Sequence, residues 1–121
     1  MKPLLPKEID LFLKRFDNFS SGEFRNTDIH SATKISVTLT AQDEAKEFDW
    51  ITITLEFEGV SDAHLVAEEK LPYIDMDDGI SLFYQEGYFY FGIGRCDNIS
   101  AIKTSTLYIQ SKTLKYKQGN F

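Results

Sequence analysis

The chain has 121 residues, of which 42% are hydrophobic and 14% aromatic, and its formal net charge is −6. This length and apolar content argue against global disorder and predict a single domain over residues 1–121. No apolar run approaches the about 18 residues of a transmembrane helix, and the chain has no cluster of Lys and Arg of the kind that binds nucleic acid.

Residues 6–19 predict an amphipathic helix. Pro6 suits a first helical position. Apolar side chains then recur at three- and four-residue spacing, on one stripe made of Ile9, Phe12, Leu13, Phe16 and Phe19. A domain of this size needs such a stripe for its own core, so we expect the helix to pack inward and to end near Gly22.

Beyond the helix the hydrophobic period changes to two. Residues 34–40 and 50–58 alternate apolar with polar side chains, which predicts two half-buried antiparallel strands, and residues 22–30 favour another strand. The polar residues 41–49 between the two alternating segments are expected to form a loop. Residues 59–75 fit neither period and are expected to be irregular.

Residues 80–93 predict a β-hairpin whose register can be derived. With Glu86-Gly87 as a two-residue turn, Gln85 pairs with Tyr88 and Ile80 pairs with Ile93. Alternation then assigns a core face, made of Ile80, Leu82, Tyr84, Phe89, Phe91 and Ile93. The opposite face carries Ser81, Phe83, Gln85, Tyr88, Tyr90 and Gly92.

Residues 105–111 and 113–117 predict the last strands, with Leu107 and Ile109 inward and Tyr108 outward. The elements together predict an α+β fold that is mainly antiparallel β-sheet, either sandwich-like or strongly curved, with one N-terminal amphipathic helix. Cys96 is the only cysteine, which is typical of a reducing compartment, and residues 1–10 become charged too early for an export signal. We therefore expect a cytoplasmic protein.

Motifs with known chemistry are incomplete in this sequence. In the segment 75–86, Gly79 stands at position five of a possible calcium loop, whereas an EF-hand needs glycine at position six. Gly92 and Gly94 lack the third glycine of a dinucleotide motif. Cys96 could form a thiol–base pair with a histidine only if the fold brought them together. We expect no metal, no cofactor and no catalytic residue.

Acids and outward aromatics are the candidate functional features. Residues 41–80 carry twelve acids against two lysines, and an acidic surface suits solubility or a basic protein partner. Five aromatic side chains are predicted to lie opposite the core faces, namely Trp50, Phe83, Tyr88, Tyr90 and Tyr108. Such residues are enriched in binding sites, but a helix or second sheet covering them would make a second core. Both alternatives stay open.

The order of these elements resembles that of small bacterial proteins of unknown function, including immunity proteins of polymorphic toxin systems. The resemblance lies in residues 28–40, 50–60 and 74–80 and in the closing strands. It implies a protein that binds a toxin tightly and blocks its active site without catalysis. The resemblance transfers no functional residue.

We therefore predict a non-enzymatic protein-binding domain. The predicted anchors are the five outward aromatics, and the acids predicted to steer a basic partner are Asp43, Glu44, Asp49, Asp75, Asp77 and Asp78. A small-ligand-binding module or a homo-oligomer, such as a homodimer, is the alternative, with the aromatic face lining a pocket or a two-fold interface.

Overall fold

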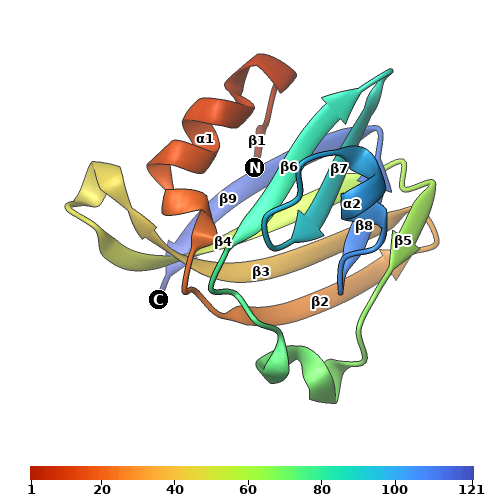
Figure 1. The fold of residues 1–121 in the computed structure, drawn as a ribbon. Helices are drawn as coiled ribbons and strands as arrows, with labels where there is room; N and C mark the ends of the chain where they lie inside the picture. Colours follow the sequence, from red (N-terminus) through yellow and green to blue (C-terminus); the bar gives the residue numbers. More distant parts are fainter.

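The computed structural model describes residues 1–121 as two antiparallel β-sheets packed face to face, with a helix beside them (Figure 1). The five-stranded sheet has the order β1-β9-β4-β3-β2, with strands β1 (Lys2–Pro3), β2 (Phe24–Ser31), β3 (Lys34–Asp43), β4 (Asp49–Glu58) and β9 (Thr113–Asn120). The four-stranded sheet has the order β5-β8-β7-β6, with strands β5 (Asp62–His64), β6 (Ile80–Gln85), β7 (Tyr88–Ile93) and β8 (Tyr108–Ser111). The predicted α+β class with antiparallel sheets is confirmed.

The N-terminal helix forms as its apolar stripe predicts. Helix α1 (Ile9–Arg15) lies between two 3₁₀ turns, η1 (Pro6–Glu8) and η2 (Asp17–Phe19). Phe12, Phe16 and Phe19 are buried and contact one another, with ring centroids 5.1 to 5.9 Å apart. The ring of Phe12 also meets that of Tyr116 on β9 at 4.8 Å, so the stripe packs onto the five-stranded sheet. No helix in the chain combines the length and apolarity that crossing a bilayer requires.

The prediction that Gly22 ends the helix is wrong. Helix α1 ends at Arg15, and the chain then turns through three residues with positive φ, Asp17 (53°), Asn18 (54°) and Phe19 (61°). Gly22 has a different role: a Cβ atom there would lie 2.2 Å from the carbonyl oxygen of Thr40. Glycine is therefore needed because two backbone segments approach closely.

Both sheets contribute to one core of 24 buried residues. Alternate residues of the longer strands β3, β4 and β7 point into the space between the sheets, and the rings of Phe57 and Phe91 meet across it at 5.2 Å. The predicted register of the β6–β7 hairpin is confirmed, from Gln85 opposite Tyr88 to Ile80 opposite Ile93. One assignment was wrong: Tyr84, which lies close to the turn of the hairpin, is 42% exposed.

Three segments differ from the expected pattern. Residues 41–43 continue β3, and η3 (Glu44–Lys46) makes the turn into β4, so residues 41–49 are not a plain loop. The segment 59–75 contains β5 and the 3₁₀ turn η4 (Glu68–Tyr73), which lies beside β2 and is green in Figure 1. Helix α2 (Ile99–Lys103) was not predicted, because five residues are too few to show a helical period.

Candidate functional site

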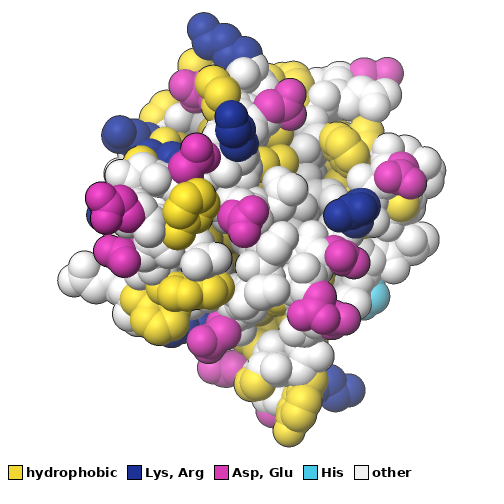
Figure 2. All heavy atoms as spheres, turned by 60° about the vertical axis from the view of Figure 1, so that its left-hand side comes forward, with side chains coloured by type: hydrophobic (Ala, Val, Ile, Leu, Met, Phe, Trp, Pro, Cys, Tyr) yellow, Lys and Arg dark blue, Asp and Glu magenta, His cyan; other side chains and the backbone are white.

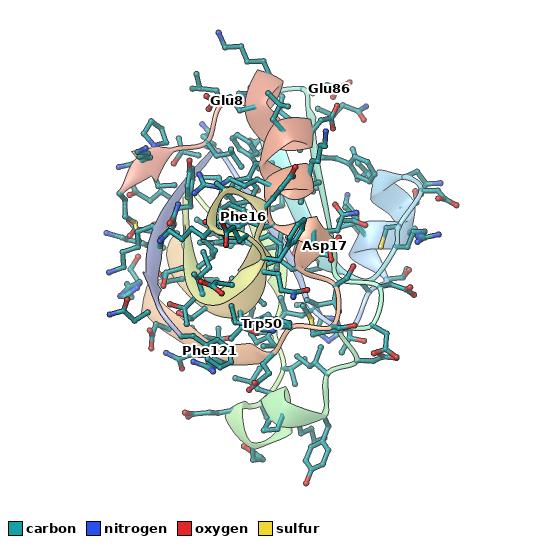
Figure 3. All side chains as sticks on the ribbon, turned by 90° about the vertical axis from the view of Figure 1, so that its left-hand side faces the viewer. Glu8, Phe16, Asp17, Trp50, Glu86 and Phe121 are labelled. Atoms are coloured by element: carbon teal, nitrogen blue, oxygen red, sulfur yellow. The ribbon has the colours of Figure 1, made fainter.

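An exposed cluster of Arg25, Trp50 and Phe121 lies on the five-stranded sheet, and we call it the stack. The ring centroids of Trp50 and Phe121 are 6.0 Å apart, and the guanidinium carbon of Arg25 lies 4.5 Å from the centroid of Phe121. Trp50 and Phe121 lie beside each other and remain 37% and 56% exposed (Figure 3). The stack thus presents two aromatic rings and a cation to solvent in a fixed arrangement.

The sheet positions each member of the stack. Ile51 on β4 pairs with Asn120 on the antiparallel strand β9. Trp50, just before Ile51, and Phe121, just after Asn120, therefore lie at the same end of these neighbouring strands. Arg25 comes from β2, which β3 and β4 separate from β9. An irregularity in strand pairing lies at Arg25, whose guanidinium N–H donates to the carbonyl oxygen of Phe121 at 2.8 Å. A β-bulge re-aims a side chain in this way.

The β3–β4 turn, residues 44–49, lies next to the stack, and we call it the tip. Every side chain in it is exposed, including those of Glu44, Glu47 and Asp49. Phe48 is 54% exposed and has a positive φ of 64°. Figure 2 shows hydrophobic side chains interspersed with acidic ones on the side of the molecule where this turn projects. The structure therefore brings the predicted Trp50, Glu44 and Asp49 together.

Asp43 does not belong to the exposed acids, and its predicted steering role is wrong. Its side chain is fully buried beneath α1 and accepts two hydrogen bonds from Arg15, at 2.9 and 3.0 Å. It also accepts one from the Ala45 N–H at 3.0 Å. The hydrogen bonds from Arg15 hold the pKa of Asp43 below its usual value, although burial opposes them. Asp43 fastens the tip to the helix.

The predicted aromatic face of the four-stranded sheet is largely covered. Tyr108 was expected to face outward as an anchor, but it is only 3% exposed. Helix α2 packs on this face and buries Ile102 completely, and Lys103 lies 5.9 Å from the ring centroid of Tyr90. Phe83, Tyr88 and Tyr90 are half-buried. For Tyr108, the alternative of a second core is therefore the correct one.

Tyr108 has a structural role that can be measured. Its hydroxyl bonds to Gln110 at 2.9 Å and Asp62 at 3.2 Å, and burial, followed by the charge of Asp62, raises its pKa. We expect Tyr108→Phe to lower the free energy of unfolding by about 1 kcal/mol. Since the raised pKa stabilises the fold below pH 10, this contribution disappears as alkaline pH ionises Tyr108.

Absorbance at 295 nm during alkaline titration checks this prediction. The difference between wild-type protein and Tyr108→Phe isolates the ionisation of Tyr108, which should occur above that of a free tyrosine and coincide with loss of the fold. A difference curve centred near pH 10 on a folded protein would contradict the assignment.

The other predicted acids, Asp75, Asp77 and Asp78, lie in an exposed turn before β6. The Asp77 N–H donates to the Asp75 carboxylate at 2.9 Å, which is the local bond of an Asx turn. The Ser21 N–H donates to the carbonyl of Met76 at 2.8 Å, so this turn packs on the segment after η2 and not on the tip. No group of three or more His, Cys, Asp or Glu side chains is arranged to hold a metal ion.

A hollow of about 240 Å³ lies between α1 and β6. Its walls include Asp10, Asp78, Phe83, Arg95 and Cys96. Neither histidine is part of these walls. His30 is held elsewhere, on the five-stranded sheet, where its Nε2 atom lies 2.9 Å from the Ser36 hydroxyl. The structure therefore does not bring His30 to Cys96 as a thiol–base pair.

Sequence reasoning missed Arg25, Phe48 and Phe121. Phe48 lies in the polar segment 41–49, for which a loop is predicted, and its φ has no sequence signal. Arg25 and Phe121 are 96 positions apart, so only strand order brings them together. Comparison of the chain with protein-family models, curated proteins and solved structures finds no match. The functional conclusion therefore depends on the residues of the stack and the tip.

Proposed function

We propose that the chain is a non-enzymatic protein-binding domain that holds a basic partner protein against the stack and the tip. The observation that carries the proposal is the stack itself, because Trp and Arg are the residue types most enriched where binding energy concentrates. The contacts of Arg25 with Phe121 already order these side chains, so less conformational entropy is lost on binding.

The conformation and exposure of Phe48 also favour a binding surface at the stack and the tip. A non-glycine residue with positive φ is strained by about 1 kcal/mol or more, and Phe48, at 54% exposed, is only partly buried within this chain. Both costs are explained if a partner covers the ring. The tip then acts as an apolar point that projects from the domain.

The charges around this surface favour a basic partner over a second copy of the chain. The tip carries Glu44, Glu47 and Asp49 against a single Lys46. In a two-fold contact the same patch meets itself, so two tips would place acids opposite acids. A basic protein would instead be attracted, and its association would slow as salt is added.

The proposal includes two finer points. We place the domain in the cytoplasm, because a single cysteine is typical of a reducing compartment. An immunity protein that blocks a toxin is the kind of binding domain that we favour, because the element order resembles such proteins. A small-ligand-binding module is the alternative, favoured by the hollow between α1 and β6, whose walls include Asp78, Phe83 and Arg95.

Substitution of the tip and the stack tests the proposal. We expect Trp50→Ser and Phe48→Ser each to weaken partner binding by about tenfold or more, because each removes an aromatic anchor, while unfolding free energy changes by about 1 kcal/mol or less. The partner is captured from a lysate, purified, and titrated against each variant at low and high salt. Trp50 is the only tryptophan, so the fluorescence of proteins that retain it reports its burial directly.

Leu11→Ser is the matched control, because Leu11 is 72% exposed on α1 and lies outside the stack and the tip. It should bind as the wild type does. Equal affinity of all three variants for the captured partner, or affinity that does not depend on salt, would contradict the proposal.

A further inference from the structure

A hollow of about 280 Å³ lies along the outer edge of β2, and we call it the β2 hollow. Its walls come from the start of β2 with the two residues before it, and from the end of η4 with the residue after it, namely Gly22, Glu23, Phe24, Arg25, Leu71, Pro72 and Ile74. Phe24 and Leu71 are buried core residues, so the floor of the hollow is apolar and fixed. In Figure 1 the η4 segment lies below β2, next to this edge of the five-stranded sheet.

The backbone of Phe24 offers unpaired hydrogen-bonding groups to this hollow. The Thr40 N–H donates to the Glu23 carbonyl at 2.9 Å, so the antiparallel alternation turns the N–H and C=O of Phe24 away from β3. β2 is an edge strand, and neither group takes part in a hydrogen bond outside the strand ladders. An extended chain added to a sheet edge pairs with a donor and an acceptor of this kind.

The β2 hollow adjoins the stack through Arg25, which forms part of both. The cation of Arg25 is already engaged by the Phe121 carbonyl and, at 3.9 Å, by Glu23. Glu23 and Arg25 are the charged residues of the walls, and their charges offset each other. The other exposed charges of residues 68–75 are three acids, Glu68, Glu69 and Asp75, against one base, Lys70. Charge complementarity therefore favours a basic occupant.

We propose that the β2 hollow binds an extended segment of the partner protein, with one apolar side chain in the hollow, flanked by Lys or Arg. The segment adds to the edge of β2 and bonds to the backbone of Phe24. This inference rests on the proposed function, because it describes the part of the same partner that continues past Arg25 from the stack.

Three blocked pentapeptides test the inference on the ¹⁵N-labelled full chain by NMR titration. The probe is acetyl-Lys-Thr-Leu-Thr-Lys-amide, one control replaces both Lys by Glu, and the other replaces Leu by Gly. We expect the probe to shift the amide signals of residues 22–25 and 71–74, and to bind about tenfold more tightly than either control. Shifts elsewhere only, none at millimolar probe, or equal binding of the Gly peptide would overturn the inference.

Two variants separate this inference from the proposed function. Glu23→Lys reverses an exposed charge at the hollow and should exchange the preference between the Lys and Glu peptides. Trp50→Ser should leave the affinity for the peptide unchanged and should lower the affinity for the captured partner. If the stack variants bind the partner normally but the peptide still occupies the β2 hollow, the proposed function is wrong and the peptide site in the β2 hollow is still supported. If Glu23→Lys does not alter the preference between the Lys and Glu peptides, the proposed binding of a basic segment in the β2 hollow is wrong.

Discussion

Replacing Arg15 by methionine is expected to lower the free energy of unfolding by about 3 kcal/mol at neutral pH, because it leaves the buried Asp43 carboxylate without its cation. Asp43 is fully buried, whereas Arg15 is 35% exposed, so the two partners are not equivalent. Asp43→Asn should cost less, about 1 to 2 kcal/mol, because Arg15 can turn to water and the amide oxygen can still accept hydrogen bonds.

The pH dependence of the Arg15→Met effect follows from the pKa of Asp43. That pKa is lower in the folded state than in the unfolded chain, so the stabilisation is fully present above pH 4 and is lost as the pH falls below the usual value of 3.8. In Arg15→Met, burial without the cation raises the pKa of Asp43 instead. The difference in unfolding free energy between the two proteins should therefore begin to shrink before the pH falls to 4 and should shrink further below it.

Urea unfolding of wild type, Arg15→Met and Asp43→Asn at several pH values measures both effects. Lys14→Met is the control, since Lys14 is an exposed neighbour on the same helix that forms none of the ion pairs of the structure. A loss in Arg15→Met no larger than in Lys14→Met, or one independent of pH, would contradict the role of this pair. Because Asp43 also fastens the tip, Arg15→Met should weaken partner binding as well.

The hairpin and Asp43 show what periodicity can and cannot predict. The β6–β7 register followed from two local facts, a two-residue Glu-Gly turn and strict alternation, and tertiary packing had no reason to change it. The alternation of Ile35, Val37, Leu39 and Ala41 likewise continues to Asp43, which points inward as a result. The polar composition of residues 41–49 favoured a loop, so the continuation of the alternation to Asp43 was overlooked. Arg15 lies 28 positions before Asp43, so only the fold could identify it as the partner of this carboxylate.

Tyr108 and the stack show two features that local sequence patterns cannot predict, namely which faces are covered and which strands are neighbours. Alternation placed Tyr108 on the correct face of its strand, but exposure depends on what covers that face, and α2 is too short to be recognised by its period. The stack depends on strand order, which no local pattern encodes: β9 pairs with β4, whereas Arg25 reaches across from β2. Sequence therefore identified Trp50 as an outward aromatic but not the residues that order it.

Gly79→Ala is expected to lower the free energy of unfolding by about 3 kcal/mol or more, or to prevent folding. Gly79 has a positive φ of 69°, and a Cβ atom there would lie 1.9 Å from the carbonyl oxygen of Asn18. That oxygen belongs to the backbone, in the segment with positive φ that joins α1 to β2, so no side-chain movement can relieve the clash. Gly87→Ala is the matched comparison, because Gly87 also has a positive φ, 87°, but nothing lies within 4 Å of its Cβ position.

The comparison separates backbone strain from steric exclusion. Alanine at positive φ costs about 1 kcal/mol by itself, so Gly87→Ala should lose about that much, and the excess in Gly79→Ala measures the close approach of the two segments. Urea unfolding of both variants, with circular dichroism to verify the fold, gives the two values. Equal losses would mean that the turn before β6 can move away from Asn18 without cost. A large excess would establish that this contact fixes α1, and with it Arg15 and the tip, to the four-stranded sheet.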